Sequence, residues 1–184
     1  MKEAVKLILV LTIICAVSSA LLAAVYGKTK DPIAKTLELR TANAAAKVMP
    51  EGVATPERRE VGGVTFFVAK KGDEIASVAL EGRSKNGYGG EIVLMVGLGA
   101  DGTLVNYQKL VANETPGLGT KMDSDGFRKP LLGRSIKADW RVKKDGGDVD
   151  AITAATISSR AVLECIRDAI AKYGKAAGQL GVRN

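Results

Sequence analysis

The stretch Asp150-Ala-Ile-Thr-Ala-Ala-Thr-Ile-Ser-Ser-Arg160 decides how the rest of the chain is interpreted. It follows a loop rich in Gly and charged residues (143–148) and precedes a helical pattern in which Val162, Ile166 and Ile170 recur on one side. Ser, Thr and Asp are favoured where a helix begins, because their side-chain oxygens accept from unpaired backbone N–H groups. The same N–H groups and the helix dipole can bind a phosphate. The pattern alone leaves two interpretations open, a capped helix start or an anion site.

Composition indicates a globular chain with one domain and appendages. Its 184 residues are 46% hydrophobic and 26% charged, which is too apolar for a disordered protein. The net charge of +7 is scattered along the chain without long basic runs, so we predict no nucleic-acid partner. A solvated surface or attraction to anionic lipid explains the charge better.

Histidine is absent and cysteine is scarce, which restricts the possible chemistry. Without histidine, the chain has no His-ligated haem, no His-based zinc site and no Ser-His or Cys-His catalysis. Cys15 lies in an apolar run and Cys165 in the C-terminal helical pattern, and neither belongs to a C-x-x-C motif. We interpret both as small buried hydrophobic residues that do not pair, and we predict no metal site.

The N-terminal part predicts a membrane segment and a stalk. Residues 7–25 are almost continuously apolar and would span roughly 28 Å as a helix, close to the thickness of a bilayer core. An uncleaved anchor is favoured over a cleaved signal peptide, and lysines on both sides leave its orientation open. Residues 32–49, with Pro32 in the first turn, predict a second helix, and residues 54–60 predict a loop. The expected division is an anchor (1–30), a helical stalk and linker (31–60) and a domain (61–184).

The domain begins with a β-strand pattern. Residues 64–69, 74–80, 91–98 and 103–110 alternate and are rich in β-branched side chains. Turn residues at 71–73 and 100–103 predict two hairpins, which residues 82–90 would connect. Trp140 and Val142 indicate another short strand, and residues 174–184 a frayed tail. The expected fold class is α+β, a single N-terminal transmembrane helix followed by a small mixed α/β domain with antiparallel hairpins.

Two glycine-containing blocks precede the 150–160 stretch. The first is Gly87-Tyr88-Gly89-Gly90, before the third predicted strand. The second is Glu114-Thr115-Pro116-Gly117-Leu118-Gly119, after the fourth. Pro and Gly at this density predict a rigid, sharply turned loop whose backbone can approach a flat ligand. An ordinary turn is the alternative interpretation.

These blocks carry a family resemblance. Residues 150–156 are similar to the D-x-x-[ST]-G-A-T signature of the FMN-binding domain family, in which a flavin transferase joins FMN to the last Thr through a phosphoester. With the other two blocks in the same order and an N-terminal anchor, the chain resembles the G subunits of Rnf ion-translocating electron-transport complexes. The related C subunits of sodium-translocating NADH:quinone reductases share the domain. Two positions depart from the pattern: Ala154 replaces the usual Gly, and Asn113 a common His. If the family's Gly requires a positive φ, Ala154 is strained.

The resemblance implies a cofactor, its site and partners. It implies FMN joined covalently to Thr156, and a chain that relays electrons as part of an oxidoreductase or translocase without catalytic residues of its own. Expected partners are the other subunits of an Rnf-type complex, which pass electrons between ferredoxin and NAD, a flavin transferase, and membrane lipid. The expected location is the inner or plasma membrane, with the domain on the extracytoplasmic (periplasmic) side. The expected cofactor-binding residues are Tyr88, Gly89, Gly90, Glu114, Thr115, Pro116, Gly117, Leu118, Gly119, Thr153, Ala154, Ala155 and Ile157.

Two charged residues receive expected roles beside Thr156. Lys121 is a candidate counter-charge for the phosphate. Asp150 orients the Thr156 hydroxyl for the transferase, binds the metal of the transferase, or is a plain turn residue. Two other functions remain open. One is a membrane-tethered binding module without a cofactor, and the other is a free-standing flavin reductase.

Overall fold

The computed structural model describes residues 2–181, which separate into two compact units, one up to Arg40 and one from Thr41 onward. The first unit is most of helix α1 (Lys2–Lys47), which is one continuous helix. The predicted break before residue 32 is therefore wrong, because Pro32 lies inside the helix at the cost of one backbone hydrogen bond. By length and composition α1 is able to cross a membrane. The predicted three-part domain division stays a prediction.

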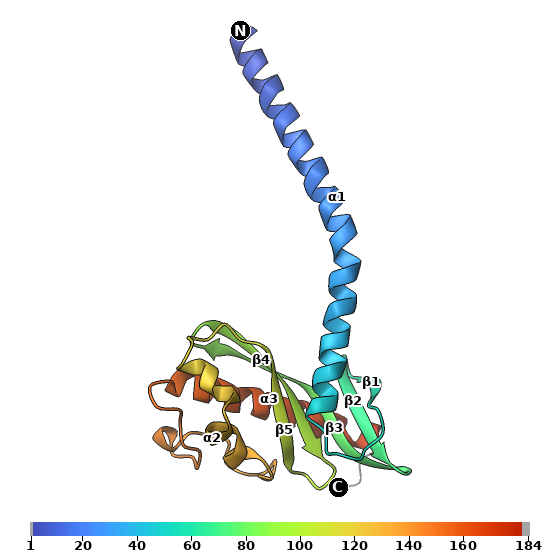
Figure 1. The fold of residues 1–184 in the computed structure, drawn as a ribbon, viewed down its shortest axis with the longest axis vertical. Helices are drawn as coiled ribbons and strands as arrows, with labels where there is room; N and C mark the ends of the chain where they lie inside the picture. Colours follow the sequence, from blue (N-terminus) through green and yellow to red (C-terminus); the bar gives the residue numbers. More distant parts are fainter. Residues whose placement is uncertain (1, 182–184) are drawn as a thin grey trace. The chain divides into compact units, whose positions relative to one another are not determined.

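The second unit contains a five-stranded antiparallel sheet (Figure 1). Each strand pairs with its neighbours in sequence, in the order β1-β2-β3-β4-β5. The four predicted strands and the α+β class are confirmed. The strands are β1 (Glu57–Val61), β2 (Val64–Lys71), β3 (Glu74–Gly87), β4 (Gly90–Gly99) and β5 (Leu104–Val111).

Turn chemistry explains the hairpins. Gly72 takes a left-handed φ of 66° between β2 and β3, as a tight turn requires. Asp101 closes the turn between β4 and β5 by accepting from the Thr103 backbone N–H at 3.1 Å and hydroxyl at 2.8 Å. The predicted connection 82–90 is wrong, since β3 runs to Gly87 and joins β4 through a third hairpin.

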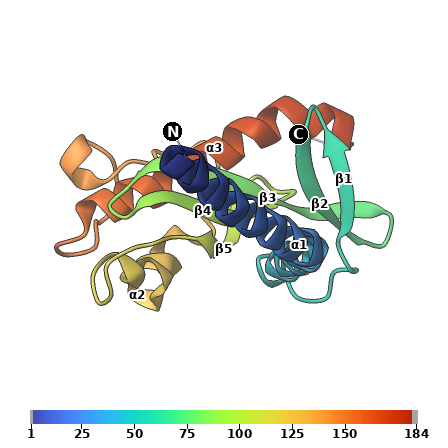
Figure 2. The same ribbon diagram turned by 90° about the horizontal axis from the view of Figure 1, so that it is seen from above.

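The two faces of the sheet are covered by different helical segments (Figure 2). Helix α3 (Thr156–Leu180) packs on one face and forms the main hydrophobic core. On the other face, Ala45 and Val48 pack with Phe67 and Met95 in a smaller cluster. Both faces of the sheet in the second unit are therefore partly buried. Because of this, β4 is buried along nearly its whole length.

Two strand glycines allow these helical segments to approach closely. A Cβ on Gly82 would overlap the Cys165 carbonyl of α3, and one on Gly97 would overlap the Val48 carbonyl. Cys165 is buried in this contact region, and burial raises the pKa of its thiol to about 12. Its thiol donates to the Ile92 carbonyl at 3.3 Å and behaves as a core group. Cys15, in contrast with the prediction, is exposed on α1, and both cysteines are free.

Three local predictions are wrong. Residues 57–61 form the edge strand β1 and not a loop. Instead of a strand around Trp140, the structure has an isolated bridge between Val142 and Val149 and a short helix η3 (Lys143–Asp145). The predicted frayed tail is helical as far as Leu180, which is buried, while residues 182–184 lie outside the described part. The remaining elements are η1 (Gly119–Asp123), α2 (Asp125–Arg128) and η2 (Lys129–Leu131).

Candidate functional site

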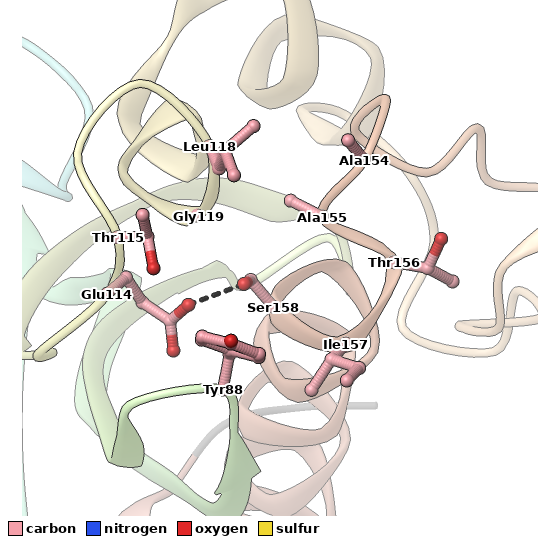
Figure 3. A pocket seen from close by; sticks show the side chains of 10 residues that line it. All are labelled: Tyr88, Glu114, Thr115, Leu118, Gly119, Ala154, Ala155, Thr156, Ile157 and Ser158. Carbon is pink, nitrogen blue, oxygen red and sulfur yellow. Dashed lines mark hydrogen bonds between the residues drawn. The ribbon is translucent and has the colours of Figure 1, made fainter.

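A pocket of about 410 Å³ lies where three segments meet: the β3–β4 turn, the loop after β5 and the first turn of α3 (Figure 3). These segments are far apart in sequence, so only the folded domain brings them together. The pocket is lined by Tyr88, Glu114, Thr115, Leu118, Gly119, Ala154, Ala155, Thr156, Ile157 and Ser158.

Glu114 ties the three segments together. Only 8% of this residue is exposed. Its carboxylate accepts from the Ser158 hydroxyl of α3 at 2.5 Å and from the Gly89 backbone N–H of the β3–β4 turn at 3.2 Å. The Gly89 N–H can only donate, and the Ser158 hydroxyl donates here, so both carboxyl oxygens of Glu114 act as acceptors. Within residues 2–181 the structure shows no ion pair to Glu114.

Glycines make this close packing possible. A Cβ on Gly119 would overlap the Glu114 carboxylate and crowd the Ser158 hydroxyl. A Cβ on Gly89 would overlap the Asn113 carbonyl, so the β3–β4 turn rests directly on the loop after β5. In that loop Gly117 has a φ of 75°, and its N–H donates to a threonine hydroxyl three residues on at 3.0 Å. The loop is thus sharply turned, as its Pro and Gly content predicted.

The start of α3 has no side-chain cap. The N-cap residue is Ala155, whose methyl side chain cannot accept a hydrogen bond, and among the described residues no other side chain caps the first turn. Ser159 acts elsewhere: its hydroxyl accepts from the Ile152 N–H at 2.9 Å and donates to the Ala155 carbonyl at 3.0 Å. The capped-helix interpretation is therefore wrong. The first N–H groups of a helix have no intrahelical partner, so those at Thr156 and Ile157 are available to an anion.

Ala154 has a left-handed backbone, with a φ of 62°. Among residues 2–181 it is the only residue other than Gly with a positive φ. An L-residue with a Cβ costs roughly 1–2 kcal/mol in this conformation. The expected strain at the position where the signature has Gly is therefore present.

Thr156, the first residue of α3, lies beside a cation that sequence reasoning missed. Its hydroxyl accepts from the Lys144 ammonium group at 3.4 Å. Arg160 holds the Lys144 loop to α3 through two hydrogen bonds to Asp145, each of 2.7 Å. The Arg160 guanidinium lowers the pKa of Asp145 through these bonds. The loop that carries Lys144 is thus fixed to α3, the helix that also carries the Thr156 hydroxyl.

The structure does not bring the two predicted charged residues to Thr156. Asp150 is exposed and paired with Lys143 at 2.8 Å. Lys121 is exposed on η1, and within residues 2–181 no hydrogen bond joins its ammonium group to Thr156. The cation beside the Thr156 hydroxyl is Lys144 instead.

Most of the other predicted site residues do line the pocket. Ser158 also lines it and was missed, because its partner Glu114 is distant in sequence. The predicted residues that do not line it are Gly89, Gly90, Pro116, Gly117, Lys121, Asp150 and Thr153.

The rim of the pocket is apolar and open to solvent. Tyr88, Leu118 and Ile157 are 69%, 39% and 46% exposed, although all three line the pocket. In Figure 3 their side chains come from three different segments and surround the same space. Large apolar side chains left in water around a cavity are typical of a ligand-binding or interaction site.

Comparison with known proteins gives the family. Residues 87–171 match the model of the FMN-binding domain. The G subunit of the ion-translocating oxidoreductase complex of Vibrio atlanticus is 33% identical over 180 residues, which cover 88% of this chain and 86% of the relative. The chain belongs to the family of G subunits of ion-translocating oxidoreductase complexes. The G subunit of Escherichia coli is also 33% identical, over 86% of this chain and 85% of its own length.

Solved structures confirm the fold of this G-subunit family member. The C subunit of the Na⁺-translocating NADH-quinone reductase of Parabacteroides distasonis superposes with a TM-score of 0.50 at 23% identity, covering 61% of each chain. NqrC of Shewanella oneidensis superposes with a TM-score of 0.53 at 21% identity, covering 65% of this chain and 62% of its own. The chain thus spans about three fifths of these structures. The resemblance inferred from the three sequence blocks is confirmed.

Proposed function

We propose that this chain is a membrane-anchored flavoprotein that carries FMN on Thr156 through a phosphoester and relays electrons within an Rnf-type ion-translocating complex. One observation carries the proposal. Three blocks separated in sequence converge on one pocket, and Thr156 is among its lining residues. The family match supports the cofactor, because the matched model is that of an FMN-binding domain.

The residues present fit both ends of FMN. The open apolar rim of Tyr88, Leu118 and Ile157 suits the flat ring system, and the pocket volume lies within the usual range for ligand sites. The uncapped start of α3 offers backbone N–H donors to a phosphate on Thr156. Lys144 supplies a positive charge at the same hydroxyl. Thr156 and Ile157, which carry the backbone donors, line the same pocket as the apolar rim, whereas Lys144 contacts Thr156 from outside the lining.

The pocket suits a relay better than a substrate-oxidising enzyme. When bound, the flavin supplies the electron-transfer chemistry, and the protein supplies position and electrostatics. The ionisable side chains among the lining residues are Tyr88 and Glu114, and Glu114 is engaged by Ser158 and Gly89. A free-standing flavin reductase would need a second space for its substrate beside the ring. The rim is instead open to solvent, which suits electron exchange with neighbouring proteins.

The surroundings of the domain complete the proposal. We propose that α1 remains as a single-pass anchor in the inner or plasma membrane, since its apolar window meets the length and composition of a span. In this proposal the soluble domain lies on the extracytoplasmic side. Its partners are the other subunits of the complex, a flavin transferase that modifies Thr156, and membrane lipid. The relatives named above are subunits of such complexes.

The test is covalent flavin on the denatured chain. Co-expressed with a flavin transferase, the wild-type band is expected to fluoresce under ultraviolet light in a denaturing gel, and Thr156→Ala is expected to be dark. Thr36→Ala is the matched control, because Thr36 is an exposed threonine on α1, outside both the motif and the pocket lining. A fluorescent Thr156→Ala band would refute the attachment site. A purified wild-type protein without visible absorbance would favour the binding module.

A further inference from the structure

Glu114 is a buried carboxylate side chain to which the proposed relay assigns no role. It is 8% exposed and lines the pocket, and its carboxylate accepts from two neutral donors, the Ser158 hydroxyl and the Gly89 N–H. Among residues 2–181 no cation forms an ion pair with it, whereas the Lys144 ammonium group lies on the Thr156 hydroxyl. The pocket therefore has a negative wall (Glu114, Gly119 and Ser158) and a positive edge (Thr156 and Lys144), where Lys144 contacts the Thr156 hydroxyl without lining the pocket itself.

The cost of this arrangement indicates a function. Burying a carboxylate without a cation is expensive, and hydrogen bonds from neutral donors compensate it only in part. A neutral amide in the same place would satisfy the same groups. The Gly89 N–H would donate to its oxygen, and the Ser158 hydroxyl would accept from its NH₂ group. Shape alone therefore does not require the charge.

We propose that the charge of Glu114 lowers the reduction potential of the flavin in this pocket. The inference rests on the proposed function, since it concerns the same site. Reduction takes two electrons from an external reductant and makes the ring more negative whenever fewer than two protons follow. A fixed negative charge in a weakly polar wall disfavours that change. Glu114 acts here through its field and its hydrogen bonds, and takes no proton or electron itself.

The experiment separates charge from shape by two substitutions. Glu114→Gln keeps the length of the side chain and its two contacts but removes the charge. Glu114→Asp keeps the charge but does not reach both Ser158 and Gly89 without a shift of the backbone. The midpoint potential of each flavinylated full-length protein is measured by spectroelectrochemical titration with dithionite, and folding is checked by circular dichroism.

We expect the potential to follow the charge. In Glu114→Gln the equilibrium ratio of reduced to oxidised flavin at a fixed potential rises at least about tenfold, which for a two-electron couple is a shift of about 30 mV. Glu114→Asp stays closer to wild type than Glu114→Gln does. Equal shifts in both variants, a larger shift in Glu114→Asp, or no shift in Glu114→Gln would overturn the inference.

Ser158→Ala is a second variant that does not depend on the folding of Glu114→Gln. Ala is the best helix former and introduces no atoms that clash. Loss of the hydroxyl removes a dipole that partly compensates the carboxylate, so the potential is expected to fall. A rise in Ser158→Ala would contradict the role of the charge. Wild-type protein without flavin would overturn the proposed function together with this inference. If wild type and Glu114→Gln both carry flavin and have the same midpoint potential, the inference alone is overturned.

Discussion

The wall and the edge of the pocket are built in opposite ways. In the wall, Glu114, Gly119 and Ser158 are buried and held by contacts between distant segments. At the edge, Thr156 is half-buried, and the exposed Lys144 reaches its hydroxyl from η3. The difference shows how one small site serves two needs. Under the proposed function, the wall positions the flavin ring, while the edge leaves the Thr156 hydroxyl accessible to the flavin transferase.

The largest effect is expected in the wall, from Gly119→Ala. The added Cβ would overlap the Glu114 carboxylate and crowd the Ser158 hydroxyl, so the wall must open. We expect the free energy of unfolding to fall by about 2 kcal/mol, which is typical of overpacking. Chemical denaturation measures it. Gly126→Ala is the control, since its Cβ meets nothing within 4 Å and helix α2 tolerates Ala. Equal stabilities of the two variants would mean that the wall is not tightly packed.

A smaller effect of opposite sign is expected from Ala154→Gly, at a pocket-lining residue two positions before Thr156. Gly adopts a φ of 62° without steric cost, although it loses more backbone entropy on folding. The net expectation is a gain of about 0.5–1 kcal/mol in the free energy of unfolding. Ala100→Gly, in an exposed turn where φ is not positive, is expected to lose stability by a similar amount. A loss in Ala154→Gly would mean that the strain is absent in solution.

The smallest effect is expected at the edge, from Lys144→Gln. Lys144 is exposed, so the free energy of unfolding should change by less than about 0.5 kcal/mol. The rate of flavin attachment by the transferase should fall about two- to five-fold, as for loss of one screened charge. A fluorescence time course measures it. Lys121→Gln is the control and should attach flavin at the wild-type rate. If Lys121→Gln were the slower variant, Lys121, as predicted from the sequence, would be the counter-charge in place of Lys144.

Local patterns explain which parts of the fold were predictable. The hairpins depend on adjacent residues such as Gly72 and Asp101, and both predicted turns are confirmed. Strand β1 was missed because its sequence, Glu-Arg-Arg-Glu-Val, has the charged composition of an edge strand and resembles a loop. The second half of β3 is polar and contains Gly82, which is typical of a connection until α3 is seen to pack against it.

Many residues of the site were predictable from the sequence, but the hydrogen bonds between them were not. The three blocks could be found by resemblance, and each contributes residues to the pocket. Ser158 was missed because a serine in a first helical turn resembles a cap, whereas its partner is a carboxylate on another segment. Lys144 was missed because spacing along the chain does not show which lysine a folded loop brings to Thr156.

The bonds of Glu114 also determine when the pocket can form. They join residues 25 and 44 positions apart, and both require the paired sheet and docked α3. Contacts of such long range form late in folding, because the loops between them must first be closed. Thr156, by contrast, is present on the chain as soon as it is synthesised. A flavin on an incompletely folded chain would lack its wall, so shielding of the ring from solvent quenchers reports that the domain has finished folding.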